Sequence, residues 1–178
     1  MLNISGKGLD YTKAPDGGWG LNEHIFKKRY DVLFDMHNIP EDIKNGVRHE
    51  HRVQRMYDTC RKKNIKLYSL ESWPQSPCIR YPIEEIKRYF GIDYFASSFD
   101  YMIALAIYQG HREISLWGVH LRAGKEYAHQ LPSVCFWIGI AYAKKIKIRI
   151  CTKSTIFKLD HLYGYNTKPE LINNFIAA

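Results

Sequence analysis

The stretch "SSFDYMIALAIYQG" (residues 97–110) predicts an apolar helix that opens with serine caps and ends at a glycine. A strand, "EISLWGV" (113–119), a second apolar helix, "PSVCFWIGIAYAKK" (132–145), and another strand, "IKIRIC" (146–151), follow it. The proline that begins the second helix suits a first turn, where no backbone donor is needed. Strands made of continuous apolar runs are typical of a sheet that is covered on both faces.

The same alternation extends toward the N-terminus. Apolar runs at 2–5, 30–36 and 65–70 predict further strands, and residues 47–63 and 82–90 have helical periodicity. Strands that alternate with helices indicate an α/β protein with an open, mostly parallel sheet and helices on both faces. We expect a single domain of this class.

The length and composition of the chain are those of one folded domain. The 178 residues are 46% hydrophobic, which excludes general disorder, and the chain is too short for a second full core. We place the domain at 1–158 and a tail at 159–178, whose tyrosines and apolar residues suggest packing or a homo-oligomer contact. The apolar runs are too short to span a bilayer and no secretion signal opens the chain, so we expect no membrane span and a cytoplasmic location.

The formal net charge of +8 favours a polyanionic or phosphate-bearing partner through electrostatic steering. A nucleotide is one such partner and nucleic acid is another. Basic runs such as "FKKRY" and "CRKKNIK" equally fit solvated helix faces and helix C-termini. Charge alone therefore leaves the partner open.

In open parallel sheets, ligands bind beyond the carboxyl ends of the strands. The turn "SGKGLDY" (5–11) lies there, and its Gly6, Lys7 and Gly8 suit a close approach to a phosphate. Further along, Asn22 supplies an amide for a base or a ribose hydroxyl. An ordinary glycine turn and an ordinary turn asparagine are the competing interpretations.

Two more segments reach the same edge. Ser97 and Ser98 open a helix, where they either cap its own amides or offer hydroxyls and amides to a phosphate. After the strand 113–119, we expect a polar loop that holds His120 and, further on, Arg122, Tyr127 and His129. Histidine, tyrosine and cations together can bind a departing phosphate and accept a proton near neutral pH.

The metal requirement is undecided from the sequence. Asp35 and His37 end a strand at i, i+2 spacing, which could ligate Mg²⁺ or Mn²⁺. The stronger interpretation is a strand-end carboxylate that orders a loop.

The segments "SSFDYMIALAIYQGHREISLWGVHL" and "EYAHQLPSVCFWIGIAYAKKIKIRI" resemble the Rossmann-like group that contains the bacterial lipooligosaccharide sialyltransferases and the MptE-like 6-hydroxymethylpterin diphosphokinases. Small phage-encoded members of this group look closer still. The resemblance covers residues 2–40 and 94–158. It implies a nucleotide or nucleotide-sugar donor, and it implies Mg²⁺ if the chemistry is that of the diphosphokinases.

The resemblance also implies roles for individual residues. The glycine turn, Asn22 and the serine-led helix start would bind the nucleotide. His129 would be the general base, and Tyr127 would be a hydroxyl beside the leaving phosphate. The chain departs from the group's pattern at Leu9-Asp10, where Pro-Ser is usual, and at His120, where aspartate is common.

Three functional hypotheses follow. The leading one is a small transferase that moves a glycosyl or phosphoryl group from a nucleotide-type donor, with His129 and His120 as bases and Tyr127 and Arg122 on the leaving phosphate. The second is a non-catalytic protein that binds or sequesters nucleotides in the same pocket. The third is a nucleic-acid-associated factor; a phage enzyme that modifies nucleic acid would combine it with the first.

Overall fold

The computed structural model describes residues 1–156 except 9, 122–124, 152–153 and 155. The tail at 159–178 lies outside the described residues. Over the described part, the chain forms a seven-stranded sheet in the order β5-β4-β3-β2-β1-β6-β7, in which every neighbouring pair is parallel. Its strands are β1 Leu2–Ser5, β2 Trp19–Leu21, β3 Val32–Asp35, β4 Lys66–Ser69, β5 Cys78–Arg80, β6 Glu113–Trp117 and β7 Lys147–Ile150.

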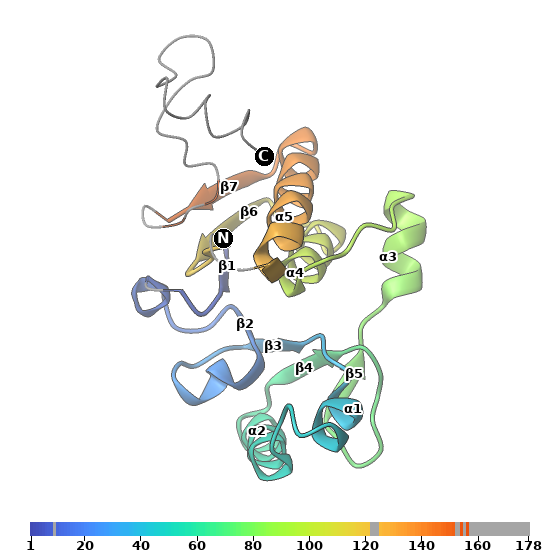
Figure 1. The fold of residues 1–178 in the computed structure, drawn as a ribbon. Coiled ribbons are helices and arrows are strands. Elements are labelled where there is room, and N and C mark those ends of the chain that lie inside the picture. The colour runs from blue at the N-terminus through green and yellow to red at the C-terminus, as the bar shows by residue number, and fades with distance from the viewer. Residues whose placement is uncertain (9, 122–124, 152–153, 155, 157–178) are drawn as a thin grey trace, which may run out of the picture.

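Helices cover both faces of this sheet, as Figure 1 shows. The α-helices are α1 Ile39–Lys44, α2 Glu50–Lys63, α3 Ile83–Phe90, α4 Ser98–Tyr108 and α5 Lys125–Ala143, with 3₁₀ turns η1 Tyr11–Lys13 and η2 Asn22–Phe26. The larger hydrophobic core lies beneath α3, α4 and α5, and the smaller one beneath α1, α2 and η2. The fold is a single-domain α/β fold of Rossmann-like type, as the sequence predicts.

The local sequence explains the two central helices. In α4, eight residues from Phe99 to Ile107 are buried because the helix packs against β3, α3 and α5. Its apolar character on all sides fits this central position. By contrast, α2 buries one stripe, Val53, Met56, Tyr57 and Cys60, at the i, i+3, i+4 and i+7 spacing of a half-covered helix.

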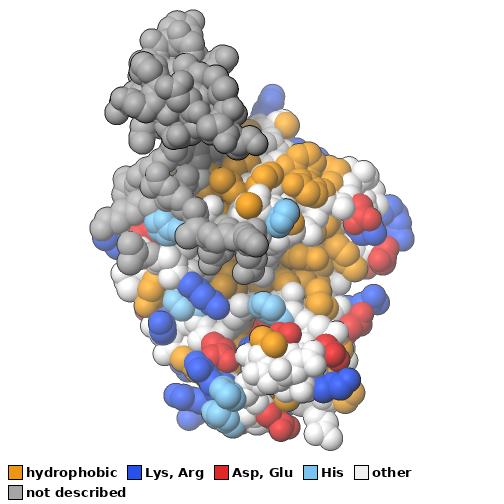
Figure 2. All heavy atoms as spheres, viewed as in Figure 1, with side chains coloured by type: hydrophobic (Ala, Val, Ile, Leu, Met, Phe, Trp, Pro, Cys, Tyr) orange, Lys and Arg blue, Asp and Glu red, His pale blue; other side chains and the backbone are white. Residues whose placement is uncertain are grey.

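Hydrophobic and charged side chains are also distributed unevenly over the surface (Figure 2). Figure 2 shows hydrophobic side chains gathered over the part of the molecule where α4 and α5 lie, and cations and histidines gathered lower down, toward α2. No helix in the described ranges is both long enough and apolar enough to traverse a bilayer.

The elements differ from the sequence prediction at four places. The short strands β2 and β5 and the short helix α1 were not predicted, and α5 begins at Lys125 where a polar loop up to residue 131 was expected. Pro132 therefore lies inside α5 rather than at its start. A helix tolerates such a proline at the loss of one backbone hydrogen bond, so Pro132 was a misleading start signal.

Candidate functional site

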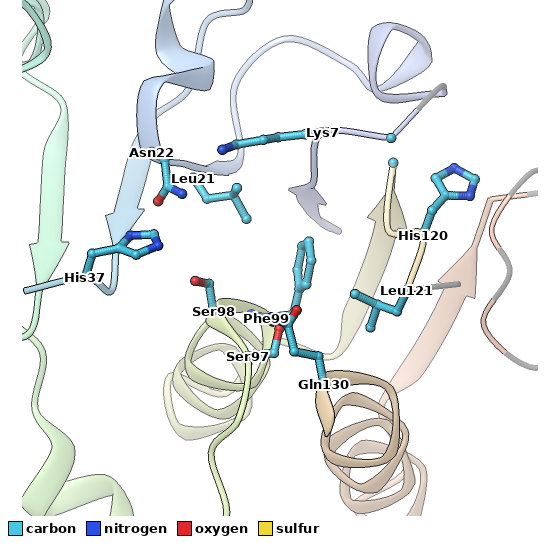
Figure 3. Close-up of a pocket in the computed structure, with 12 residues that line it drawn as sticks. Lys7, Leu21, Asn22, His37, Ser97, Ser98, Phe99, His120, Leu121 and Gln130 are labelled. Carbon is cyan, nitrogen blue, oxygen red and sulfur yellow. Dashed lines mark hydrogen bonds between the residues drawn. The ribbon is translucent and has the colours of Figure 1, made fainter. Parts of the chain in front are cut away.

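The candidate site lies where the strand order reverses. From β1, the chain adds β2 to β5 on one side, and then returns to place β6 and β7 on the other. Ligands of open α/β sheets bind at such a switch point, beyond the carboxyl ends of the strands. A cavity of about 390 Å³ opens there (Figure 3), and its lining residues are Lys7, Gly8, Leu21, Asn22, His37, Ser97, Ser98, Phe99, Gly118, His120, Leu121 and Gln130.

The glycine turn after β1 is bonded to the end of β6. The Gly6 amide donates to the Trp117 carbonyl at 2.7 Å, and the Gly8 amide donates to the Gly118 carbonyl at 2.8 Å. A Cβ at position 6 would lie 2.4 Å from the Gly118 oxygen, so the backbones need glycine to pack this closely. Both glycine amides already have acceptors, so neither of them is free to donate to a phosphate.

Asp10 holds the same junction together. This residue is only 2% exposed, and its Oδ1 accepts from the Gly118 amide at 2.8 Å and lies 3.1 Å from Nε2 of His120. Within the described ranges, its Oδ2 has no hydrogen-bond partner. Since a carboxylate can only accept, the pair favours the tautomer of His120 that carries its proton on Nε2.

The two serines at the start of α4 have different surroundings. Ser97 is the N-cap: its hydroxyl accepts from the Phe99 amide at 3.3 Å, and Asp100 Oδ2 accepts from the amides of Ala96 and Ser97 at 2.7 and 2.8 Å. The hydroxyl of Ser98 points into the cavity (Figure 3) and has no hydrogen-bond partner among the described residues. Burial raises the pKa of the Asp100 carboxyl to about 6.

The opposite wall is formed by Lys7 and Asn22. Lys7 reaches from the turn after β1 toward Asn22 in Figure 3, and its side chain is exposed. Asn22 has a left-handed backbone, φ 51°, and its buried Oδ1 accepts no hydrogen bond from the described part of the chain. Leu21 and Phe99 give the cavity an apolar side.

Asp35 and His37 end β3 beside this wall. Nδ1 of His37 lies 2.7 Å from Asp35 Oδ1, and Arg48 donates to Asp35 Oδ2 at 2.6 Å. Both Asp35 oxygens therefore have partners, and a cation would lie next to a guanidinium. Within the described ranges, no group of three or more histidine, cysteine or acidic residues gathers in a metal-binding arrangement. The pair fits the loop-ordering interpretation, and it does not fit a Mg²⁺ site.

The structure brings together most of the residues that the sequence singled out. Lys7, Gly8, Asn22, Ser97, Ser98 and His120 line one cavity, and Gly6 lies directly behind it. His129 does not join them: it is exposed on α5, and its neighbour Gln130 lines the cavity. Successive residues of a helix point about 100° apart, so His129 and Gln130 cannot both face the cavity as closely as they could in a loop. Arg122 and the side chain of Tyr127 lie outside what the structure describes.

Sequence reasoning missed five lining residues, namely Leu21, His37, Phe99, Gly118 and Leu121, as parts of a binding site. His37 was considered only as a metal ligand. Its position directly after a strand was a usable signal, since carboxyl ends of parallel strands meet at one edge. No protein-family model matches this chain, and neither a curated protein nor a solved structure matches it.

Proposed function

We propose that the protein binds a nucleotide or nucleotide-sugar in the switch-point cavity and transfers a glycosyl or phosphoryl group from it to an acceptor. One observation supports this proposal above all others. Residues from six separate segments, among them Lys7, Asn22, Ser98 and His120, line one cavity at the carboxyl edge of a parallel sheet. Nucleotide sites are common at this position of such sheets.

The lining suits the parts of a nucleotide. Ser98 offers a hydroxyl and the first-turn amide of α4, where the helix dipole favours an anion, and Lys7 adds a positive charge. Because the amides of Gly6 and Gly8 are bonded to the last residue of β6 and to the turn after it, we assign the phosphate contacts to Lys7 and Ser98. The unpaired Oδ1 of Asn22 can accept from a ribose hydroxyl or a base amine.

Among the histidines expected as bases, His120 is the one that lines the cavity. Asp10 fixes its orientation, and its ring packs against Gly8, where a Cβ would lie 1.9 Å from His120 Cδ2. This position suits contact with a leaving phosphate. The resemblance to sialyltransferases and pterin diphosphokinases also favours a nucleotide-type donor. The metal-dependent chemistry of the diphosphokinases is less favoured, because both oxygens of Asp35 are already bonded to protein side chains.

A second candidate function is association with nucleic acid. A groove of about 590 Å³ beside α2 is lined by His51, Arg55, Lys62 and Lys63, with Asp58 as its acidic member. Arg55 lies 4.7 Å from the centroid of the Phe26 ring. A steep salt dependence of DNA or RNA binding, lost when Lys62 and Lys63 are replaced by methionine, would support this function.

Calorimetry against mono-, di- and triphosphates of the four nucleosides, with common sugar conjugates, tests the leading proposal. We expect one base class to bind and Lys7→Met and Ser98→Ala to weaken it about tenfold each. Lys27→Met is the matched control, because Lys27 is exposed and lines neither this cavity nor the groove beside α2. Product formation with a bound donor separates a transferase from a protein that only sequesters nucleotides. Absence of binding by every nucleotide would refute both forms.

A further inference from the structure

Two carboxylate–histidine pairs flank the cavity, and the sequence predicted neither of them as a hydrogen-bonded pair; the first is Asp10–His120. The second is Asp35–His37 at the end of β3, joined by the 2.7 Å contact between Oδ1 and Nδ1. The Asp35 side chain is 0% exposed, whereas that of His37 is 44% exposed. The histidine is therefore fixed at its buried edge and open at the other, and in Figure 3 its ring lies across the cavity from His120.

Asp35 also accepts a hydrogen bond from a second partner, Arg48. Arg48, whose side chain is 11% exposed, contacts Oδ2 at 2.6 Å and balances the charge of the buried carboxylate. Since the carboxylate only accepts, Nδ1 of a neutral His37 carries the proton, and Nε2 is left as the basic nitrogen. The same relationship orients the histidine of hydrolytic triads.

His37 also lies where two cavities meet. It lines the main cavity and a smaller adjoining one of about 230 Å³, which shares Lys7, Asn22 and His37 with it. An acceptor in the smaller cavity and a donor in the larger one would meet at this residue. Such a position suits a group that takes a proton from the acceptor.

We propose that His37 is the proton-accepting residue of the transfer reaction and that Asp35 is its positioning residue; this inference rests on the proposed function. The O–H bond of the acceptor hydroxyl breaks and its proton moves to Nε2 of His37. The oxygen's electron pair forms the bond to the transferred carbon or phosphorus atom. The donor's phosphate leaves with the electron pair of the bond that breaks, next to His120 and Lys7.

The surroundings of His37 set the expected pH dependence. The hydrogen bond that His37 donates to Asp35 raises the pKa of the imidazole, and burial opposes this rise. Charged groups that line the adjoining cavity with His37 are Lys7, Glu23, Asp42 and Arg48. A base must be unprotonated, so turnover should rise with pH through a value above that of an ordinary histidine.

The test compares His37→Gln and Asp35→Asn with the wild type, using sugar conjugates of whichever nucleoside class binds. Initial rates of nucleotide release give kcat and KM across pH, and NMR of the ring nitrogens gives the titration of His37. We expect His37→Gln to lower kcat by about 10²–10⁴-fold with little change in binding. Asp35→Asn should shift both the rate profile and the titration of His37 to lower pH.

Two variants control for indirect effects. His49→Gln replaces an exposed histidine of the α2 N-cap that lines neither cavity, and it should retain wild-type kcat. Asp35→Asn leaves Arg48 without its carboxylate, so Asp35→Asn combined with Arg48→Met replaces it if the single variant fails to fold.

Each outcome is decisive. Unchanged kcat in His37→Gln overturns the inference and leaves the proposed function standing. Binding of a nucleotide without turnover of any donor also overturns it, while nucleotide binding stands. If no nucleotide binds the wild type, the proposed function fails and the inference fails with it.

Discussion

The amide of Gly8 donates a hydrogen bond to the carbonyl oxygen of Gly118 at 2.8 Å, and so joins the turn after β1 to the turn after β6. Asp10 strengthens the same junction by accepting from the Gly118 amide. One wall of the cavity is therefore a single bonded unit, although its two parts come from opposite ends of the domain.

Replacing Gly8 by alanine should disturb this unit. The new Cβ would lie 1.9 Å from His120 Cδ2 and 2.7 Å from the Gly118 oxygen, so the ring and the backbone must both shift. We expect Gly8→Ala to lower the free energy of unfolding by about 1–3 kcal/mol, measured by urea denaturation. Gly139→Ala is the control: this α5 glycine has open space around its Cβ position, and alanine there should stabilise by about 0.5–1 kcal/mol. Equal effects of the two changes would contradict the packing argument.

Substitutions of the two serines at the start of α4 should have different effects. Ser97→Ala removes the N-cap and should cost about 1 kcal/mol of stability, measured by thermal or urea unfolding. Ser98→Ala removes a hydroxyl that only the cavity uses, so stability should stay within about 0.5 kcal/mol while nucleotide affinity falls. A stability loss confined to Ser98→Ala would show that the roles are reversed.

His24 should make the protein sensitive to acid. It is buried, its Nδ1 lies 2.8 Å from the Tyr30 hydroxyl, and burial, aided by Lys27, Lys7 and Lys28, lowers its pKa to about 4. The folded state therefore favours neutral His24. Its contribution to stability is complete above the ordinary pKa of about 6.5 and is lost as pH falls from there toward about 4.

The measurement is urea denaturation between about pH 7 and pH 4.5. His24→Gln keeps a polar group beside Tyr30 but cannot titrate, so it should remove up to about 3 kcal/mol of the acid-induced loss. His49→Gln, at an exposed position, should leave the pH profile unchanged. A wild-type slope in His24→Gln would rule out this histidine as the cause.

Arg48 and Arg52 should differ although both pair with acids. Arg48→Met leaves the fully buried Asp35 without its guanidinium partner and should cost about 3–5 kcal/mol. Arg52 is 53% exposed and lies 2.6 Å from Glu23 Oε2, so Arg52→Met should cost at most about 1 kcal/mol. Denaturant unfolding compares the two, and adding Asp35→Asn to Arg48→Met should recover much of the loss. Similar costs for both arginines would mean that Asp35 is solvated in solution.

The sequence predicts the fold class because its clearest signals are long. The apolar helices around Ile103 and Trp137 alternate with the continuous apolar runs of β6 and β7, and this alternation is typical of an open parallel sheet. The strands β2 and β5 have three residues each, and β2 contains a glycine that packs against Tyr30. No pattern of period two can be recognised in so short a segment.

The site was harder to predict than the fold. The positions of Lys7, Asn22 and Ser98 followed from the rule that strand ends meet at one edge. The misplacement of His129 followed from the start of α5, because the loop expected before Pro132 is helical. Whether a strand-end carboxylate such as Asp35 holds a metal or a histidine depends on Arg48, whose approach no local pattern shows.

The pairing of Leu2 with Ile114 in the central strands has a consequence for biosynthesis. As the chain leaves the ribosome, β1 to β5 can assemble in order, but the edge of β1 that pairs with β6 stays unpaired until β6 has been made. The switch-point cavity is thus among the last features to be completed, and a truncated translation product that stops before β6 exposes the unpaired backbone edge of β1 to chaperones or to aggregation.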